Sequence, residues 1–363
     1  MKKREVLFRL LRASLWGESL KPVEMPTAVY RSLMSMADMQ TVSGLIGEAM
    51  MSGGVTLSKY DAIDLYTRQR AVAEQNESLD EGVARLARLL NENAVSYVIV
   101  KGQTLATLYP QPRVRIPGDI DVYVTPSGLE RLSGILKDEW GLELPPKGSG
   151  KHVSVEYNGT ELEVHHRLND FASKVHQRYW DGLYDTCFSI AETVDIGGTP
   201  VKKLPPTLEV LFVFVHMYYH LLVLGCGLRQ LIDVGMVLHA YRDRIDAEAL
   251  QAHLHGIGMY DAFCAVGHIL VGKIGLSAED FPFEIESWHK KYEQRILDDM
   301  FYRGNFGKYH RKVSGVGWWH TLETGWIIGS HCLKFFRLSP KEILALYPKH
   351  IASSLTGKLR FAD

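Results

Sequence analysis

The chain is poor in cysteine and carries no excess of charge of either sign. Its 363 residues include four cysteines, none in a Cys-x-x-Cys pair, which argues against a disulfide framework or a zinc ribbon. Lysine and arginine (41) almost balance aspartate and glutamate (42), which gives a net charge of −1. Because proteins that coat DNA or anionic membranes need a basic excess, no extended DNA binding is expected. A reducing, cytoplasmic location fits this composition best.

Two apolar stretches need an explanation: the N-terminal one could be a signal peptide, and the second could be a membrane span. Arg9 and Arg12 interrupt the N-terminal stretch, and no small-residue cleavage site follows it, which favours an amphipathic helix. The second stretch, 208–228, has the length of about 20 residues that a span needs. It also carries a glutamate and two histidines, which are costly in hydrocarbon. We expect a buried helix there and no membrane partner.

Hydropathy patterning divides the chain into three regions. Residues 1–90 have the apolar spacing of helices, with a long amphipathic pattern over 61–90. Residues 91–200 alternate between short strand patterns and helical patterns, and residues 201–363 return to helical spacing broken by glycine and proline. The sequence therefore predicts a compact unit of strands and helices between two helical regions.

A β-hairpin is the strongest local signal. Asn158-Gly159 separates two alternating runs, and such a pair favours a type I′ turn because both positions need a positive φ. A two-residue loop fixes the register, so Ser154 should lie opposite Glu163 and His152 opposite His165. The apolar residues of both strands then share one face of the hairpin, and these polar residues share the other.

A capped helix is predicted after the strand 119–124. Ser127 and Glu130 have the spacing of a capping box, in which each side chain binds a free backbone amide at the other residue. Leucines and an isoleucine over 129–136 supply an apolar face. A strand is thus expected to lead directly into a helix that packs on the sheet.

Three carboxylates form the candidate chemical centre. Asp119 and Asp121 are two residues apart on a predicted strand and so point to the same side, roughly 6.6 Å apart along it. Glu163 lies on the polar side of the hairpin. If the two strands are neighbours, the three carboxylates can hold two divalent cations, the arrangement that suits phosphoryl or nucleotidyl transfer.

Positive and flexible groups near these acids suit phosphate binding. The apolar run 96–100 ends in Lys101-Gly102 and leads into a short helical piece, whose first amides can face a phosphate. Arg115 can grip a phosphate with two parallel hydrogen bonds. Separately, an Asp-x-Asp pair and a Lys-Gly turn are more often structural. Their joint order is what favours a functional site.

These residues give the sequence a resemblance to a known family. The stretches VIVKGQTLATLYPQPRVRIPGDIDVYV (98–124) and ELEVHHRL (161–168) resemble the uncharacterised nucleotidyltransferase-like family of the DNA polymerase β superfamily. The positions that carry the resemblance are Lys101, Gly102, Tyr109, Arg115, Asp119, Asp121, Glu163 and His165. A later stretch, 204–234, matches the family's helical pattern through His216, Arg229 and Asp233. The resemblance covers roughly residues 95–240.

The resemblance implies an α+β fold, with a small mixed-sheet nucleotidyltransferase core flanked by N- and C-terminal helical regions. It also implies a transferase that moves an NMP from an NTP, with ATP as the expected donor, to a hydroxyl of a small molecule, RNA or protein. Pyrophosphate would leave, and Mg²⁺ or Mn²⁺ would be the cofactor. The implied catalytic and metal-binding residues are Asp119, Asp121 and Glu163. The implied nucleotide-binding residues are Lys101, Gly102, Gln103, Thr104, Arg115 and His165.

Departures from the family pattern leave alternatives open. Most of the superfamily has Gly-Ser at the turn, whereas Gly102 is followed by Gln103, so a catalytically inactive nucleotide- or partner-binding module is the main alternative. Glu161 lies on the same side of the hairpin as Glu163 and competes with it for the role of third acid.

A third hypothesis is a phosphohydrolase that holds a transition metal through His216, His220 and Asp233. By default, however, histidines at i, i+4 on an apolar helix are buried core residues. Arg229 and Asp233 have the same spacing, which is typical of a helical ion pair.

Overall fold

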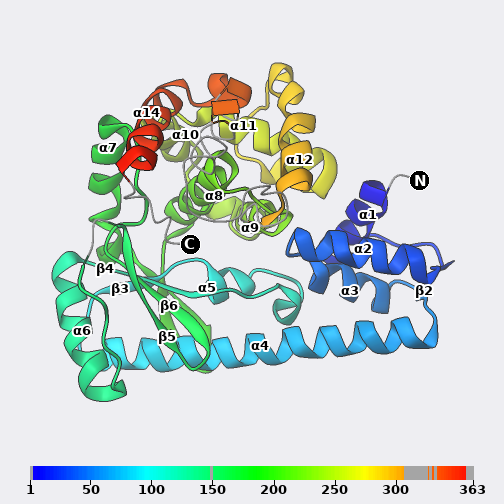
Figure 1. The fold of residues 1–363 in the computed structure, drawn as a ribbon, viewed down its shortest axis with the longest axis horizontal. Coiled ribbons are helices and arrows are strands. Elements are labelled where there is room, and N and C mark those ends of the chain that lie inside the picture. The colour runs from blue at the N-terminus through cyan, green and yellow to red at the C-terminus, as the bar shows by residue number, and fades with distance from the viewer. Residues whose placement is uncertain (1–2, 148–149, 306–325, 327–328, 331–332, 357–363) are drawn as a thin grey trace.

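The computed structural model describes residues 3–147, 150–305, 326, 329–330 and 333–356. The fold is layered around a sheet (Figure 1). The long helix α4 (Lys59–Glu92) runs along the lower side of the view, the sheet lies above one end of it, and C-terminal helices lie above the sheet. The predicted α+β class with a mixed sheet is confirmed.

The first helices pack together beside the other end of α4 (Figure 1). They are α1 (Lys3–Trp16), α2 (Thr27–Met39) and α3 (Ser43–Ser52), and the short strands β1 (Val23–Glu24) and β2 (Val55–Thr56) pair in parallel next to them. The hydroxyl of Ser58 caps α4 by accepting from the amide of Asp61. The amphipathic pattern predicted over 61–90 is therefore one continuous helix.

The central sheet has the strand order β5-β6-β4-β3-β8-β7. The pairs β4–β6 and β3–β8 are parallel, whereas β3–β4, β5–β6 and β7–β8 are antiparallel, which makes the sheet mixed. The strands are β3 (Tyr97–Ile99), β4 (Ile120–Val124), β5 (His152–Tyr157), β6 (Thr160–His165), β7 (Glu192–Ile196) and β8 (Thr199–Lys203).

The two faces of the sheet have different partners. The alternate residues that point toward α4 and α6 (Pro126–Trp140) are apolar and form one core with these helices. They include Ile120, Val122, Val124, Val153, Leu162 and Val164. The polar residues of the same strands point the other way, toward the C-terminal helices. Strand alternation thus gathers the acids of β4 and β6 on one side of the sheet.

The hairpin register is confirmed at every predicted pair. Ser154 lies opposite Glu163, and His152 lies opposite His165. Asn158 and Gly159 have φ angles of 50° and 76°, as a type I′ turn requires. The agreement follows from two local constraints, the turn chemistry and the apolar alternation, which select the same register.

The predicted capping box of α6 is wrong. The hydroxyl of Thr125, not that of Ser127, caps the helix by accepting from the amide of Gly128 at 3.0 Å. Pro126 then occupies the first helical position, where its fixed φ fits and its missing N–H is not needed. The helix therefore begins earlier than the Ser-x-x-Glu spacing suggested.

A helical layer covers the polar face of the sheet. α5 (Gly102–Ala106) follows β3, and the later helices are α7 (Lys174–Tyr184), α8 (Pro206–Val223), α9 (Leu228–Ala240), α10 (Ala247–Gly256), α11 (Tyr260–Ile269), α12 (Lys291–Arg303) and α14 (Pro340–Thr356). α8 has the length and apolar composition of a membrane span, but 72% of that window is buried inside the protein. The larger core joins α8 and α9 to the N-terminal helices. The division at residues 90 and 200 stays a prediction.

Candidate functional site

A cavity lies between the polar face of the sheet and helices α8 and α9. Its volume is about 100 Å³, and it draws its lining from α5, the segment before β4, the hairpin and both helices. The lining residues are Lys101, Gly102, Leu105, Arg115, Gly118, Asp119, Lys151, Glu163, Val213, His216, His220, Leu224, Arg229, Gln230 and Asp233. Residues up to 132 positions apart in the chain therefore meet here.

The sheet register brings the three predicted acids together. β4 and β6 are parallel neighbours, and Asp121 lies directly opposite Glu163. Asp119 precedes Asp121 by two residues, so it points to the same side. Carboxylate oxygens of all three residues lie within 4.8 Å of one another. Asp121 and Glu163 are buried, and Asp119 is half-buried at the cavity.

Lys101 supplies a cation to this group from a strained backbone position. Its Nζ lies 2.8 Å from Oδ1 of Asp121. Burial alone would lower the pKa of Lys101, but the attraction of Asp121, Asp119 and Glu163 outweighs it and raises the pKa. Lys101 has φ 61° and ψ −151°, a region that only glycine visits readily. The fold holds this lysine there at a cost in backbone free energy.

Gly102 continues the unusual backbone. It has φ +50°, and a Cβ at this position would lie 3.3 Å from the carbonyl oxygen of Asp119. The turn after β3 and the segment before β4 therefore approach each other closely, and the glycine leaves the backbone of the turn open to the cavity.

His165 joins two of the acids. Its Nε2 lies 2.8 Å from Oδ1 of Asp121 and 3.0 Å from Oε2 of Glu163. Burial would raise the pKa of Glu163, but the hydrogen bond from His165 and the charge of Lys101 outweigh it and lower the pKa to about 2. Burial lowers the pKa of His152, opposite His165, to about 4. Glu163 is thus held as a carboxylate and His152 as a neutral imidazole near pH 7.

Arg115 forms a buried ion pair with Asp233. Its Nε and Nη2 donate to the two carboxylate oxygens of Asp233 in α9, at 2.8 and 2.9 Å. The hydroxyl of Tyr109 donates to the same carboxylate at 2.7 Å. Nη1 of Arg115 has no hydrogen-bond partner among the described residues. One edge of the guanidinium therefore fixes the segment before β4, whereas Nη1 is buried and unpaired within the described part of the chain.

The prediction of an ion pair between Arg229 and Asp233 is wrong. Arg229 donates instead to the carbonyl oxygens of Ile116 and Pro117, at 2.9 and 3.2 Å. Asp233 pairs instead with Arg115, which lies more than 100 residues away in the chain. Tertiary packing thus overrides the i, i+4 spacing, and both arginines tie the segment before β4 to α9.

Three predicted nucleotide-binding residues do not line the cavity: Gln103, Thr104 and His165. Nε2 of Gln103 donates to Oδ1 of Asp80 in α4 at 2.5 Å. The hydroxyl of Thr104 donates to the carbonyl of Lys101 at 2.7 Å, within its own turn. The side chains of Gln103 and Thr104 are buried and their hydrogen bonds stabilise the turn, although Oε1 of Gln103 has no hydrogen-bond partner among the described residues.

His216 and His220 form part of the helical wall of the cavity. Burial, together with the nearby charges of Lys101 and Lys151, lowers the pKa of both imidazoles well below the usual value. Among the described residues they form no group with Asp233 at metal-binding distance. Both oxygens of Asp233 are already engaged by Arg115. The ligand set of the phosphohydrolase hypothesis is therefore not brought together.

Lys151 and His152 belong to the site but were not predicted as part of it. Lys151 lines the cavity, and burial and the charge of Lys101 lower its pKa. His152 approaches Glu163, with its Nδ1 at 3.5 Å from Oε2. The sequence signal that could have found His152 was the hairpin register, which already paired it with His165. Lys151 had no comparable signal, because it is the last residue of a loop, where no strand register fixes the direction of its side chain.

Glu161 does not compete for the position of Glu163. It lies on the same side of the hairpin but is exposed and does not line the cavity. The outcome reflects the position of β4, whose Asp121 pairs with Glu163 and not with Glu161.

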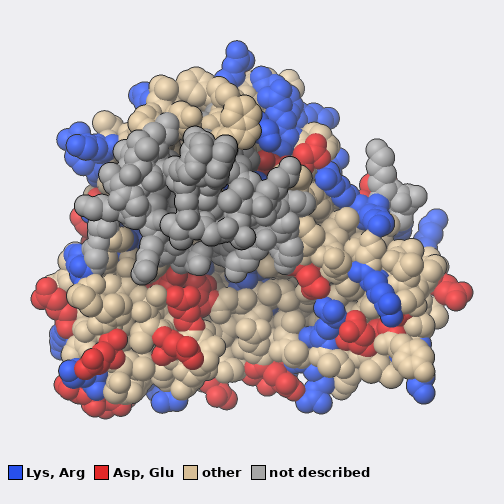
Figure 2. All heavy atoms as spheres, viewed as in Figure 1, with Lys and Arg blue, Asp and Glu red and all other residues tan. Residues whose placement is uncertain are grey.

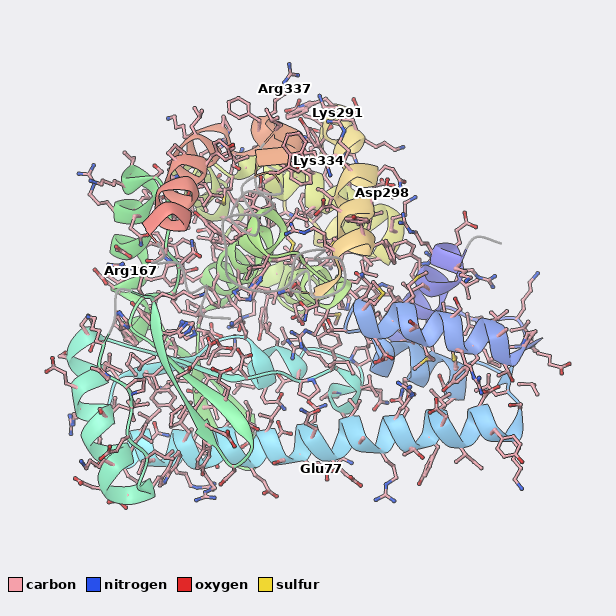
Figure 3. All side chains as sticks on the ribbon, viewed as in Figure 1. Glu77, Arg167, Lys291, Asp298, Lys334 and Arg337 are labelled. Atoms are coloured by element: carbon pink, nitrogen blue, oxygen red, sulfur yellow. The ribbon has the colours of Figure 1, made fainter. Side chains whose placement is uncertain are left out.

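Most other charged groups lie away from the cavity. Figure 2 shows Lys and Arg side chains gathered at the top of the view, over α12. Lys291, Lys334 and Arg337 lie in this region in Figure 3, above the helical layer, whereas Glu77 lies on the outer side of α4. These exposed groups do not line the cavity.

The three acids fit a divalent cation. Oδ2 of Asp121 is buried and has no hydrogen-bond partner among the described residues. A buried carboxylate oxygen without a donor is costly, and Mg²⁺ binds carboxylate oxygens of this kind. Asp119 and Glu163 place further oxygens within reach. The donor set is thus chemically suited to the metal that the sequence predicts.

Comparisons with known proteins agree with this picture at the level of the family. A model of the family described as uncharacterised nucleotidyltransferase matches residues 28–271. Among solved structures, an antigenic nucleotidyltransferase-like protein from Paracoccidioides brasiliensis is similar, with 15% identity and a TM-score of 0.36, over 59% of this chain and 96% of that one. Among curated proteins, none matches this sequence.

Proposed function

The chain belongs to the family of uncharacterised nucleotidyltransferases, and from this premise we propose that it transfers an NMP from an NTP to a hydroxyl acceptor, with release of pyrophosphate. The observation that carries the proposal is the meeting of Asp119, Asp121 and Glu163, with ligand oxygens within 4.8 Å of one another, beside a cavity that Asp119 and Glu163 line. ATP is the expected donor. The acceptor is a hydroxyl of a small molecule, RNA or protein.

Asp119, Asp121 and Glu163 would hold the divalent cation. When bound, Mg²⁺ or Mn²⁺ would supply positive charge that stabilises the charge developing on the reacting phosphate. Because its pKa is lowered to about 2, Glu163 stays ionised across the physiological range. Its carboxylate is thus ready as a metal ligand.

The nucleotide would approach from the side of the turn after β3. Lys101, Gly102 and Arg115 line the cavity there. His165 holds Asp121 and Glu163 at a fixed separation. Gln103 and Thr104 would act indirectly, because their hydrogen bonds shape the turn.

The test is pyrophosphate release and transfer of label from NTPs in the presence of Mg²⁺. Glu163→Gln and Asp121→Asn keep side-chain size and remove a charge, and each is expected to lower turnover by at least about 100-fold, the usual scale for loss of a group that stabilises transition-state charge. Glu161→Gln is the matched control, since it is an exposed acid on the same strand and side. Equal activity of the two glutamate variants would contradict the proposal.

A non-catalytic nucleotide-binding module is the second candidate. It is favoured by Lys101, whose ammonium already neutralises Asp121 at 2.8 Å, and by the absence of a serine after Gly102. Calorimetric titration with NTPs separates the two functions. Saturable binding with no pyrophosphate release from any NTP would support the module, whereas Mg²⁺-dependent turnover that Asp121→Asn abolishes would exclude it.

A further inference from the structure

We infer a second metal position at this site, formed by His152, Glu163 and His165 and suited to a transition-metal dication such as Zn²⁺. Ligand atoms of the three residues lie within 4.8 Å of one another, and His165 and Glu163 are buried. All three side chains come from the two strands of one hairpin. The register that pairs His152 with His165 places them on one side.

The donor spacing fits one small ion. Nε2 of His165 lies 3.0 Å from Oε2 of Glu163, and Nδ1 of His152 lies 3.5 Å from the same oxygen. With tetrahedral zinc bonds of about 2.0–2.2 Å, two ligands on one ion are separated by about 3.3–3.6 Å, so the pair of His152 and Glu163 already has this spacing and the pair of His165 and Glu163 has to open by a few tenths of an ångström. Two histidines and a glutamate are also a set that proteins use for zinc, and three ligands leave a coordination position open.

The hydrogen bonding of the histidines is incomplete without a cation. The side chain of His152 is 5% exposed, yet its Nδ1 has no hydrogen-bond partner among the described residues, although it faces Glu163. His165 directs one nitrogen at two carboxylate oxygens, and its other nitrogen, Nδ1, has no partner either. Buried polar atoms are normally satisfied, so the unpartnered Nδ1 of His152, which faces Glu163, points to a ligand at this position.

The chemistry of the donors separates this position from a magnesium site. Imidazole nitrogen suits zinc, iron and nickel, whereas carboxylate oxygen suits magnesium. The set of two histidines and Glu163 should therefore select a transition metal in the presence of Mg²⁺. The two positions share Glu163 but differ in their other ligands. Metal binding here is independent of whether the protein transfers nucleotides.

The experiment is a Zn²⁺ titration of the metal-free, full-length protein in excess Mg²⁺, followed by calorimetry and by metal analysis after gel filtration. One equivalent of Zn²⁺ is expected to bind. His152→Gln should weaken binding by at least about tenfold, since even groups that only support a ligand cost 10–100-fold. His239→Ala removes an imidazole that bonds Asp280 elsewhere and is the matched control. No uptake by the wild type, or equal affinity of His152→Gln, overturns the inference.

A spectroscopic variant keeps the test decisive if His152→Gln is unstable. Co²⁺ substitutes for zinc and reports its ligands by visible absorption. In His152→Cys, a thiolate should replace the nitrogen ligand, because the donor of His152 is Nδ1, which lies close to Cβ, and should add a sulfur-to-cobalt charge-transfer band that the wild type lacks. A folded His152→Cys protein, checked by circular dichroism, that binds Co²⁺ without this band contradicts the assignment.

Failure of this inference is distinguishable from failure of the proposed function. Asp119 belongs to the acid trio but not to the histidine set. Asp119→Asn should therefore abolish nucleotidyl transfer and leave Zn²⁺ affinity within about twofold of the wild type. Loss of Zn²⁺ binding in this variant, with its fold intact, would show that the histidines form no separate position.

Discussion

Replacement of Lys101 tests whether the site stores backbone strain. The residue has φ 61° and ψ −151°, and its side chain is 13% exposed and ion-paired with the fully buried carboxylate of Asp121. Lys101→Ala removes the charge and keeps the strained backbone. Lys101→Gly removes the charge and also the strain. The difference between the two variants therefore reports the backbone alone.

The expected magnitudes follow from these contacts. Removing one partner of a buried pair costs about 3–5 kcal/mol, so Lys101→Ala should lose about that much stability. Relief of the strained backbone stabilises the folded state of the glycine variant by about 1–3 kcal/mol. The greater conformational entropy of glycine in the unfolded chain offsets about 0.4–1 kcal/mol of this gain. Lys101→Gly should thus be more stable than Lys101→Ala by about 1–2 kcal/mol.

Urea unfolding followed by fluorescence and circular dichroism measures both differences. Lys137→Ala is the matched control, because Lys137 also pairs with a carboxylate, Glu143, but on an exposed surface. It should unfold like the wild type. If Lys101→Gly is no more stable than Lys101→Ala, the backbone is not strained and the reasoning fails. If both match the control, the ion pair with Asp121 contributes nothing.

Two further predictions concern buried charge. Asp233→Asn leaves the guanidinium of Arg115, 4% exposed, without its carboxylate and should cost about 3–5 kcal/mol in urea unfolding. Glu74→Gln, which breaks the exposed pair with Arg70, should cost at most about 1 kcal/mol, and equal losses would contradict the argument. The pKa of His152 is lowered to about 4, so between pH 6.5 and 4 the unfolded chain binds a proton that the folded state rejects. Stability should fall by up to about 3 kcal/mol as the pH drops through this window, and less in His152→Gln. An identical pH dependence of the unfolding free energy in both proteins would refute this assignment.

The two proposals can be tested separately because Asp119 belongs to one ligand set and His152 to the other, although His165 also bonds Asp121. Nucleotidyl transfer depends on Asp119 and Asp121, whereas the second metal position depends on His152 and His165. Only Glu163 belongs to both groups. The cavity itself is tied together by Arg115, whose bonds to Asp233 connect the segment before β4 to α9.

Local sequence determined the elements that carry the site. Asn158-Gly159 and the alternating runs beside it fixed the hairpin register, because the turn and the apolar pattern constrain the same few residues. The alternation of β4 placed Asp119 and Asp121 on one side. These predictions needed no distant contact. The prediction of the cap of α6 was wrong for a reason that is also local. Thr125 caps the helix and Pro126 begins it, so Ser127 and Glu130 lie within the helix.

Only the tertiary structure decided which of these groups meet. The parallel pairing of β4 with β6 places Glu163, and not Glu161, opposite Asp121. The packing of α9 brings Asp233 to Arg115, so Asp233 pairs with Arg115 and not with Arg229. Gln103 was turned toward α4 for the same reason. Sequence spacing fixes direction along one strand or helix, but distances between elements depend on how their apolar faces pack. That packing placed a buried lysine and two histidines around the acids.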